Sequence, residues 1–354
     1  MRNYKIGIFH DYFNNLGGGE KLVLTLAEKL HSVIFTSYFN KKISKKININ
    51  KNKIIVFKKK FFFKNIFSWF NYVPKKNYLI NILSGNYSIF LNKKNKKKKF
   101  IYYCHGLPKA YFRYAEFNEN YNFFKKILIF FSKKIFIKYY LKNLREVNYV
   151  IANSKYTKLQ LKKFYKKKIT VIYPPINIKQ FTLGGRGKYF LSANRHEKDK
   201  NIDKIISVFK KLNKKKIIIT SEGSQTKKLK EISKNNKNII FTGLVSNSQY
   251  IKLLKNCIAT IYLAKNEDFG MSAIESLSVG KPVIAMYSGG LKEILIKNQN
   301  CFLVSKNKIQ KDLFKIISKK SNKEFFNLRY KCRKTIYKFN ETNFLKKIKS
   351  IIKK

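Results

Sequence analysis

Short apolar runs alternate with amphipathic segments along most of this 354-residue chain. In the first half, six runs have the length and the β-branched or aromatic content of buried strands: residues 5–9, 33–38, 54–57, 100–103, 147–152 and 169–173. Helical periodicity appears at residues 22–30 and again at 154–165, where Ser154 is a suitable N-cap. Strands that alternate with helices in this way predict a parallel α/β sheet.

A second alternation follows a break in the pattern. Pro174-Pro175 is a stiff segment, and glycines at 184, 185 and 187 follow it. Beyond the break, strands are predicted at 189–192, 217–220, 239–241, 258–263 and 282–285, with helices at 202–212, 226–232 and 247–254. The sequence therefore predicts two tandem Rossmann-like α/β domains, residues 1–177 and 178–335. Residues 336–354 are predicted to form a C-terminal helix. One possible arrangement is that this helix packs back on the first domain.

Residues 264–290 combine acidic residues, glycines and turn signals around one apolar helical pattern. The pattern predicts a helix that starts near Phe269-Gly270 and ends with Gly280 as its C′ residue, before a buried strand. A helix start beside a loop that carries Glu267 and Asp268 is suited to bind a diphosphate flanked by ribose hydroxyls. Glutamates near a helix start also serve simply as partners of the helix dipole, and this alternative stays open for Glu267.

Three further loops offer groups for an anionic ligand. Gly17, Gly18 and Gly19 separate the first strand from its helix and let backbone approach a phosphate closely. The loop is neither a G-x-G-x-x-G fingerprint nor a P-loop, which disfavours dinucleotide and P-loop proteins. His105 follows a predicted strand, where α/β sheets collect ligands, although a lone histidine is more often structural.

Arg195 and Lys200 lie in a short loop between a predicted strand and a helix. An arginine binds a diphosphate through a bidentate fork, and a lysine binds it as a mobile point charge. Two neighbouring cations carry little weight in a chain with 78 lysines and arginines, so their place after a strand matters more than their charge.

The formal net charge of +60 favours a polyanionic partner, either nucleic acid or an anionic membrane. Joint over-use of Lys, Asn, Ile, Phe and Tyr also fits codons rich in A and T, so compositional drift remains an alternative. Residues 58–76 and 122–144 mix lysines with aromatic residues, and each segment either lies in a bilayer interface or packs on the sheet. No recognised nucleic-acid-binding signature is present, so we expect no specific nucleic-acid partner.

Other sequence features bear on chemistry and location. The dispersed histidines and the lack of an H-E-x-x-H or D-x-D element argue against a bound metal, and the absence of G-x-S-x-G argues against a serine hydrolase. Four separated cysteines, no signal-peptide pattern and no apolar run of spanning length predict a cytoplasmic protein, soluble or peripheral on a membrane.

Taken together, these motifs resemble the retaining nucleotide-sugar glycosyltransferases of the GT-B fold, family four. The E-x7-E element corresponds to Glu267 and Glu275, the Arg-x4-Lys element to Arg195 and Lys200, and the glycine-rich first loop to GGGEK. Further landmarks are IANSKYT at 151–157, VIYPPIN at 171–177 and SGGLKEI at 288–294. Their order and spacing extend the resemblance along nearly the whole chain.

The resemblance implies an enzyme of bacterial cell-surface polysaccharide synthesis whose two domains face each other across a cleft. The first domain would hold a glycan or lipid-linked acceptor, and the second would hold the nucleotide sugar. By the same likeness, Arg195 and Lys200 neutralise the leaving diphosphate, Glu267 contacts the sugar, and Glu275 accepts hydrogen bonds from the ribose. The backbone of Gly17–Gly19 and of Asp268–Gly270 would lie by the donor, and His105 by the sugar.

The segments YYCHGLPKAYFRY and VIYPPIN are similar to O-antigen-type mannosyltransferases, which favours GDP-mannose as the donor and implies no separate cofactor. Gly106, Leu107 and Lys109 depart from the usual Y-x-H-[ST]-P-x-R-Y pattern, and this departure leaves the acceptor contacts open. Two alternatives remain: a basic membrane- or nucleic-acid-binding module, and an inactive scaffold of glycosyltransferase type.

Overall fold

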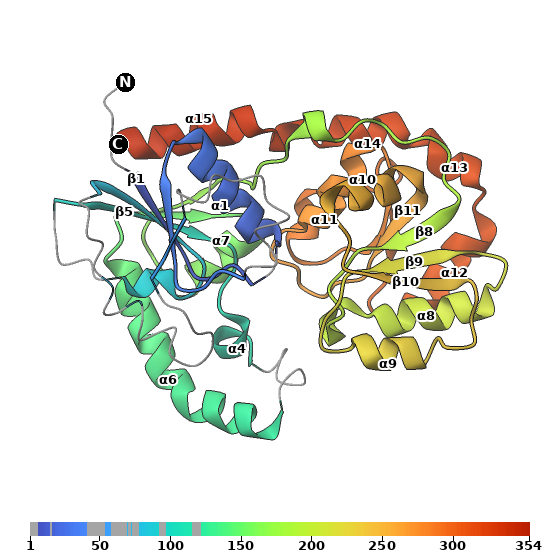
Figure 1. Cartoon of the computed structure of the whole chain (residues 1–354), viewed down its shortest axis with the longest axis horizontal. Coiled ribbons are helices and arrows are strands. Elements are labelled where there is room, and N and C mark those ends of the chain that lie inside the picture. The colour runs from blue at the N-terminus through green and yellow to red at the C-terminus, as the bar shows by residue number, and fades with distance from the viewer. Residues whose placement is uncertain are drawn as a thin grey trace. The chain divides into compact units, whose positions relative to one another are not determined.

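The computed structural model describes residues 6–14, 16–40, 54–57, 69, 72, 78–91, 97–114 and 122–354. Two compact units divide the chain: unit 1 comprises Met1–Pro175 with Thr342–Lys354, and unit 2 comprises Ile176–Glu341. Each unit contains one parallel sheet with helices on its faces (Figure 1). Apart from Trp69 and Tyr72, the lysine- and aromatic-rich segment 58–76 lies outside the described residues.

Unit 1 has a seven-stranded sheet in the order β3-β2-β1-β4-β5-β6-β7. The strands are β1 Ile6–His10, β2 Val33–Thr36, β3 Ile54–Val56, β4 Ile80–Ser84, β5 Lys99–Cys104, β6 Tyr149–Ala152 and β7 Ile169–Val171. The pattern along the chain did not predict β4, although all five of its residues are buried. Asn81 interrupts its apolar run, and this buried amide is satisfied by donating to the Tyr78 carbonyl at 3.1 Å.

Side chains that alternate along the strands of unit 1 divide its core into two layers. Ile8 points into a layer covered by α1 (Gly18–Lys29) and α15 (Glu341–Lys353). Phe9 points into the opposite layer, covered by α6 (Phe123–Arg145) and α7 (Lys155–Lys162). Shorter helices are η2 Ser88–Phe90 and α4 Lys109–Phe112. The last helix of the chain is thus part of the core of unit 1 rather than a surface addition.

Unit 2 has a six-stranded sheet in the order β10-β9-β8-β11-β12-β13. Its strands are β8 Tyr189–Ser192, β9 Ile217–Thr220, β10 Ile239–Gly243, β11 Cys257–Tyr262, β12 Val283–Met286 and β13 Cys301–Val304. Its α-helices are α8 Ile202–Lys211, α9 Thr226–Glu231, α10 Asn247–Asn256, α11 Met271–Ser278, α12 Ile309–Lys319, α13 Asn322–Asn327 and α14 Arg329–Thr335. Its 3-10 turns are η4 Ile178–Gln180, η5 Lys198–Lys200, η6 Gly289–Glu293 and η7 Tyr337–Phe339.

The predicted fold class of two parallel Rossmann-like sheets is confirmed. In each sheet the first strand of the unit pairs with both the second and the fourth, so β1 lies between β2 and β4, and β8 between β9 and β11. At such a switch point the connections run away in opposite directions, and the loops at the carboxyl ends of the strands leave room for a ligand. Among the described residues, no helix is both long enough and apolar enough to cross a bilayer.

Candidate active site

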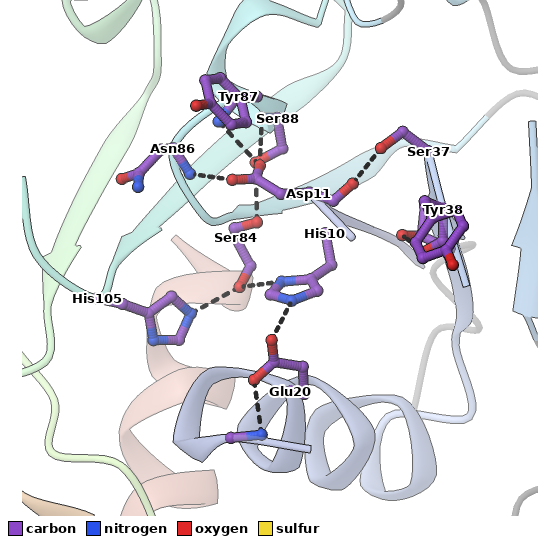
Figure 2. A network of polar contacts seen from close by, with 12 residues as sticks. His10, Asp11, Glu20, Ser37, Tyr38, Ser84, Asn86, Tyr87, Ser88 and His105 are labelled. Carbon is purple, nitrogen blue, oxygen red and sulfur yellow. Dashed lines mark hydrogen bonds and ion pairs between the residues drawn. The ribbon is translucent and has the colours of Figure 1, made fainter. Parts of the chain in front are cut away.

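In unit 1 the polar residues gather at the carboxyl ends of β1, β4 and β5. His10 ends β1, Ser84 ends β4, and His105 follows β5, while Glu20 faces them from the first turn of α1 (Figure 2). Ser84 Oγ lies 3.1 Å from His10 Nδ1 and 2.7 Å from His105 Nε2. A Glu20 carboxylate oxygen lies 4.0 Å from His10 Nε2. These groups form one continuous chain from Glu20 through His10 and Ser84 to His105.

The direction of the hydrogen bonds follows from the carboxylate at one end of this chain. Glu20 only accepts, so it favours a proton on His10 Nε2 and leaves His10 Nδ1 as an acceptor. Ser84 then donates to His10, and its oxygen accepts from Nε2–H of His105. In the described part of the chain, His105 Nδ1 has no hydrogen-bond partner. This series of hydrogen bonds therefore leaves His105 Nδ1 as an acceptor that a ligand hydroxyl could use.

The pKa values agree with a neutral His105. Burial, assisted by the neighbouring His10, lowers the pKa of His105 to about 3. Burial alone would raise the pKa of Glu20, but the neighbouring His10 outweighs it and lowers the pKa overall. Glu20 is therefore ionised and His105 uncharged at neutral pH, so His105 acts as a hydrogen-bonding group and not as a cation.

We expect Glu20→Gln to reverse the polarity of this chain. Its amide can still accept from Gly17 N–H, which Glu20 holds at 3.0 Å, while its NH₂ group faces His10 and moves the proton to His10 Nδ1. His105 would then carry its proton on Nδ1 and lose its acceptor, which would weaken binding of a ligand hydroxyl there about ten- to hundredfold through one mispaired hydrogen bond. The tautomer is read from ¹⁵N shifts of the imidazole. The exposed Glu28→Gln on the same helix is the control, and an unchanged His105 tautomer in Glu20→Gln would contradict the assigned direction.

Asp11, next to His10, fixes the loop after β4. Its buried carboxylate accepts from the backbone N–H groups of Asn86, Tyr87 and Ser88 at 2.5, 2.8 and 2.7 Å (Figure 2). Burial raises the pKa of Asp11, against the opposing effects of His10 and these three hydrogen bonds. The carboxylate thus ties the ends of β1 and β4 together and holds Ser84 in place.

Asp11→Ala is expected to lower the free energy of unfolding by about 3 kcal/mol or more, because it leaves three N–H groups without their acceptor. Urea titration measures the loss. Glu28→Ala, at an exposed position of α1, should change the same quantity by less than about 0.5 kcal/mol. A similar small effect in both variants would show that Asp11 does not hold the loop.

The three glycines predicted to approach a phosphate lie where α1 begins. Gly17 is the N-cap residue, and Gly18 and Gly19 form the first turn, so the helix starts four residues earlier than its apolar pattern predicts. A Cβ on Gly19 would lie 3.6 Å from the His105 ring. The structure therefore brings the glycine loop and His105 together, within unit 1.

In unit 2, Lys200 and Glu267 meet at the carboxyl edge of the sheet. Lys200 ends η5, after β8, and its buried Nζ lies 2.5 Å from Glu267 Oε2 and 3.5 Å from Asp199 Oδ2. Burial alone would lower the pKa of Lys200, but the two carboxylates outweigh it and raise the pKa. Lys200 is therefore a fixed, fully charged ammonium whose charge is balanced by carboxylates.

The loop that carries Glu267 is held from behind by the segment after β12. Ser288 Oγ accepts from Asn266 N–H at 3.2 Å, and Gly290 N–H donates to the Glu267 carbonyl at 2.7 Å. A Cβ on Gly289 would lie 2.2 Å from that carbonyl, and the φ of Gly289 is +59°. Only glycine fits at position 289, because its backbone lies directly against the backbone of Glu267. This close packing and the Gly290 hydrogen bond set the position of Glu267.

Glu275 lies on α11, beyond the loop. It is buried, and the hydroxyl of Tyr250 donates to it at 2.9 Å. The helix begins at Met271, with Gly270 as a left-handed N-cap, so its predicted start near Phe269 is two residues early. The predicted Gly280 C′ residue is confirmed, with φ +76° and the paired bonds Gly280 N–H to Leu277 and Lys281 N–H to Ser276.

The other predicted site residues of unit 2 differ in exposure. Arg195 is exposed in the loop after β8, and Asp268 is partly buried. Phe269 is 3% exposed and contacts the Phe339 ring at 5.5 Å, so its side chain belongs to the core and only its backbone can face a ligand. The structure thus brings Lys200 and Glu267 into contact, with Glu275 on the adjoining helix.

Sequence reasoning missed His10, Asp11, Glu20 and Ser84 in unit 1, and Tyr250 in unit 2. A signal existed for His10 and Asp11, because both directly follow an apolar run at the end of a predicted strand. Glu20 also had a signal, because it directly follows the three glycines of the predicted phosphate loop. Ser84 carried no signal, because its strand was not predicted.

Comparison with known protein families finds a match for each half of the chain. The family described as glycosyl transferases group 1 matches residues 175–339, and glycosyltransferase family 4 matches residues 16–180. Each match covers a little under half of the chain. Lys200, Glu267 and Glu275 lie in the region similar to the group 1 family, and the glycine loop and His105 lie in the region similar to family 4.

Relatives at low identity carry related names. The chain is 31% identical to an uncharacterized glycosyltransferase of Methanocaldococcus jannaschii, over 45% of each chain. It is 26% identical to the alpha-1,3/1,6-mannosyltransferase ALG2 of Mus musculus, over 52% of this chain and 53% of ALG2. The matches therefore span about half the length of these relatives. Anabaena HepE, solved in complex with UDP and glucose, has the same GT-B fold, with a TM-score of 0.79 at 15% identity over 99% of both chains.

Proposed function

We propose that this chain is a retaining glycosyltransferase that moves mannose from GDP-mannose to a glycan or lipid-linked glycan in bacterial cell-surface polysaccharide synthesis. The observation that carries the proposal is the buried Lys200–Glu267 pair at the switch point of unit 2, in the region similar to the group 1 family. A lipid-linked acceptor would bring the enzyme to the inner face of the cytoplasmic membrane. We propose this location as well.

Sugar transfer breaks the bond between the anomeric carbon and a diphosphate oxygen, so negative charge grows on the diphosphate and positive charge on the sugar. Lys200 and Arg195 are the cations proposed to stabilise the diphosphate, which lets protein groups rather than a metal balance its charge. The diphosphate would compete with Glu267 for the Lys200 ammonium. Released from Lys200, the Glu267 carboxylate would contact the sugar, and Glu275 would accept from the ribose hydroxyls.

For unit 1 we propose two groups that bind the substrates. The backbone of Gly17–Gly19 would lie near the diphosphate, at the amino end of α1. His105 would accept a hydrogen bond from a sugar hydroxyl through Nδ1, as the Glu20–His10–Ser84 chain directs.

Mannose is favoured over other hexoses by two observations of different kinds. The VIYPPIN and YYCHGLPKAYFRY segments resemble mannosyltransferases of O-antigen type, and the relative ALG2 is named as a mannosyltransferase. HepE, which shares the fold, was solved with UDP and glucose, and therefore UDP-glucose is the donor to compare directly with GDP-mannose.

A thermal-shift screen against GDP-, UDP- and ADP-sugars tests the proposal. A ligand that binds only the folded chain raises the unfolding midpoint, and we expect GDP-mannose to raise it most. Glu275→Ala should remove most of that shift. If no nucleotide sugar shifts the midpoint, the alternatives of an inactive scaffold or a basic binding module replace the enzyme. If a UDP- or ADP-sugar gives the largest shift, the donor assignment is wrong.

A further inference from the structure

The amino-terminal half of α6 exposes an unusual amount of apolar surface. Phe123, Phe124 and Phe131 are 71%, 81% and 73% exposed, and the side chains of Ile127, Phe130 and Ile135 are also exposed. Isolated exposed apolar residues are common, but a contiguous apolar patch on one helix marks an interaction surface. We call these six residues the α6 face.

The opposite side of α6 anchors the helix in unit 1. Phe136 stacks on Tyr111 with ring centroids 3.8 Å apart, and Tyr140 shares a hydrogen bond with Tyr102 at 2.7 Å. Along a helix of 3.6 residues per turn, Phe136 and Tyr140 lie opposite Phe124 and Phe131. The carboxyl-terminal half is therefore fixed to the sheet, and the amino-terminal half extends beyond it (Figure 1).

Charge on α6 is of one sign. The helix contains six lysines and one arginine and no acidic residue. Lys134 and Lys138 are exposed on the same side of the helix as the α6 face, one and two turns further along. Lys133 lies at the flank, with its ammonium 5.8 Å from the Tyr114 ring. An apolar patch with lysines along its border suits a surface that is apolar inside and anionic outside.

We propose that the α6 face inserts into the interface of an anionic phospholipid bilayer, with its phenylalanines among the acyl chains and its lysines at the headgroups. Pairing with a second copy of this chain would bring the same lysines together, which like-charge repulsion opposes. The proposal concerns where the chain binds and does not depend on the donor or on catalysis.

Vesicle binding by a charge-neutral variant tests this assignment. The triple variant Phe124→Ser, Phe130→Ser and Phe131→Ser keeps the net charge, so non-specific attraction to anionic lipid is unchanged. Its affinity for vesicles of phosphatidylglycerol and phosphatidylcholine in equal parts should fall about a hundredfold, through loss of apolar burial. A matched triple variant at exposed apolar residues elsewhere, Leu159→Ser, Leu244→Ser and Tyr330→Ser, should bind as the unaltered chain does.

Each outcome decides for or against the α6 face. Equal binding by both triple variants, or equal binding of the unaltered chain to pure phosphatidylcholine vesicles, would overturn the proposal. A change from dimer to monomer in the α6 variant, measured by light scattering, would show that a second copy covers the face. Unfolding midpoints and nucleotide-sugar shifts should be the same in all three proteins, which separates this result from any failure of the proposed function.

A spectroscopic test reports insertion directly. The chain has one tryptophan, the fully buried Trp69, so a new tryptophan on the surface is easily distinguished. In Phe131→Trp, vesicles should shift the emission to the blue, and brominated lipids should quench it. Tyr330→Trp, an exposed position in unit 2, should show neither effect. If Phe131→Trp behaves like Tyr330→Trp, the α6 face does not enter the bilayer.

Discussion

Replacing Lys200 with alanine is expected to lower the rate of sugar transfer by about 10²- to 10³-fold. The buried ammonium is positioned before the donor arrives, through its contacts with Glu267 and Asp199, so its charge costs no rearrangement during the reaction. Initial rates with GDP-mannose and an acceptor extract measure the effect. The larger part should appear in kcat, because the diphosphate gains charge as the bond breaks.

Two companion variants separate catalysis from structure. Lys198→Ala removes an exposed lysine from the same turn, η5, and should retain nearly full activity. Lys200→Arg keeps the charge in a different shape and should recover part of the loss. The fold should persist in Lys200→Ala, since the Glu267 side chain is 20% exposed and can be hydrated. Turnover in folded Lys200→Ala at the level of Lys198→Ala would remove Lys200 from the active site.

Glu275→Ala is expected to weaken nucleotide-sugar binding by about a hundredfold. A buried carboxylate that accepts from two ribose hydroxyls makes charge-assisted bonds worth about 1.5–3 kcal/mol each, of which a part is lost on truncation. The dissociation constant of the bare nucleoside diphosphate should rise by a similar factor, because the ribose belongs to the leaving group. Fluorescence competition against a labelled nucleotide gives both values.

Tyr250→Phe distinguishes a ribose contact from a structural role of Glu275. The Tyr250 hydroxyl donates to Glu275 at 2.9 Å, and the variant removes that bond while keeping the carboxylate. Nucleotide affinity in Tyr250→Phe should change less than about tenfold. If Tyr250→Phe weakens binding as much as Glu275→Ala, Glu275 acts by holding Tyr250, and its assignment to the ribose is wrong.

Much of the fold was predictable because its signals are local. Strands β8 and β9 have the bounds that the apolar runs predict, and Ser154 caps α7 as expected by accepting from Thr157 N–H at 2.9 Å. Strand β4 was not predictable in the same way, because Asn81 is buried in the middle of the sheet. Only its tertiary partner, the Tyr78 carbonyl, makes that residue acceptable inside a strand.

The residues of the candidate site likewise fall into those that the sequence predicted and those that only the structure revealed. Glu267 and Lys200 were found by their places after predicted strands and by resemblance, although 67 residues separate them and their ion pair needed the fold. Ser84 and His10 were missed because their meaning arises from contact: 74 residues separate them, and no local pattern marks either as part of a hydrogen-bonded chain. Sequence position predicted Lys200 and Glu267 in the loops after their strands, and the structure supplied their contact and the two missed strand-end residues, His10 and Ser84.

The most direct test of the central claim is calorimetric titration of GDP-mannose into the unaltered chain and into Glu275→Ala, in buffer without an acceptor. We predict one binding site per chain in the unaltered protein, and binding about a hundredfold weaker in Glu275→Ala. Absence of binding in the unaltered protein, or equal affinity in both, would contradict the donor site built on Lys200, Glu267 and Glu275.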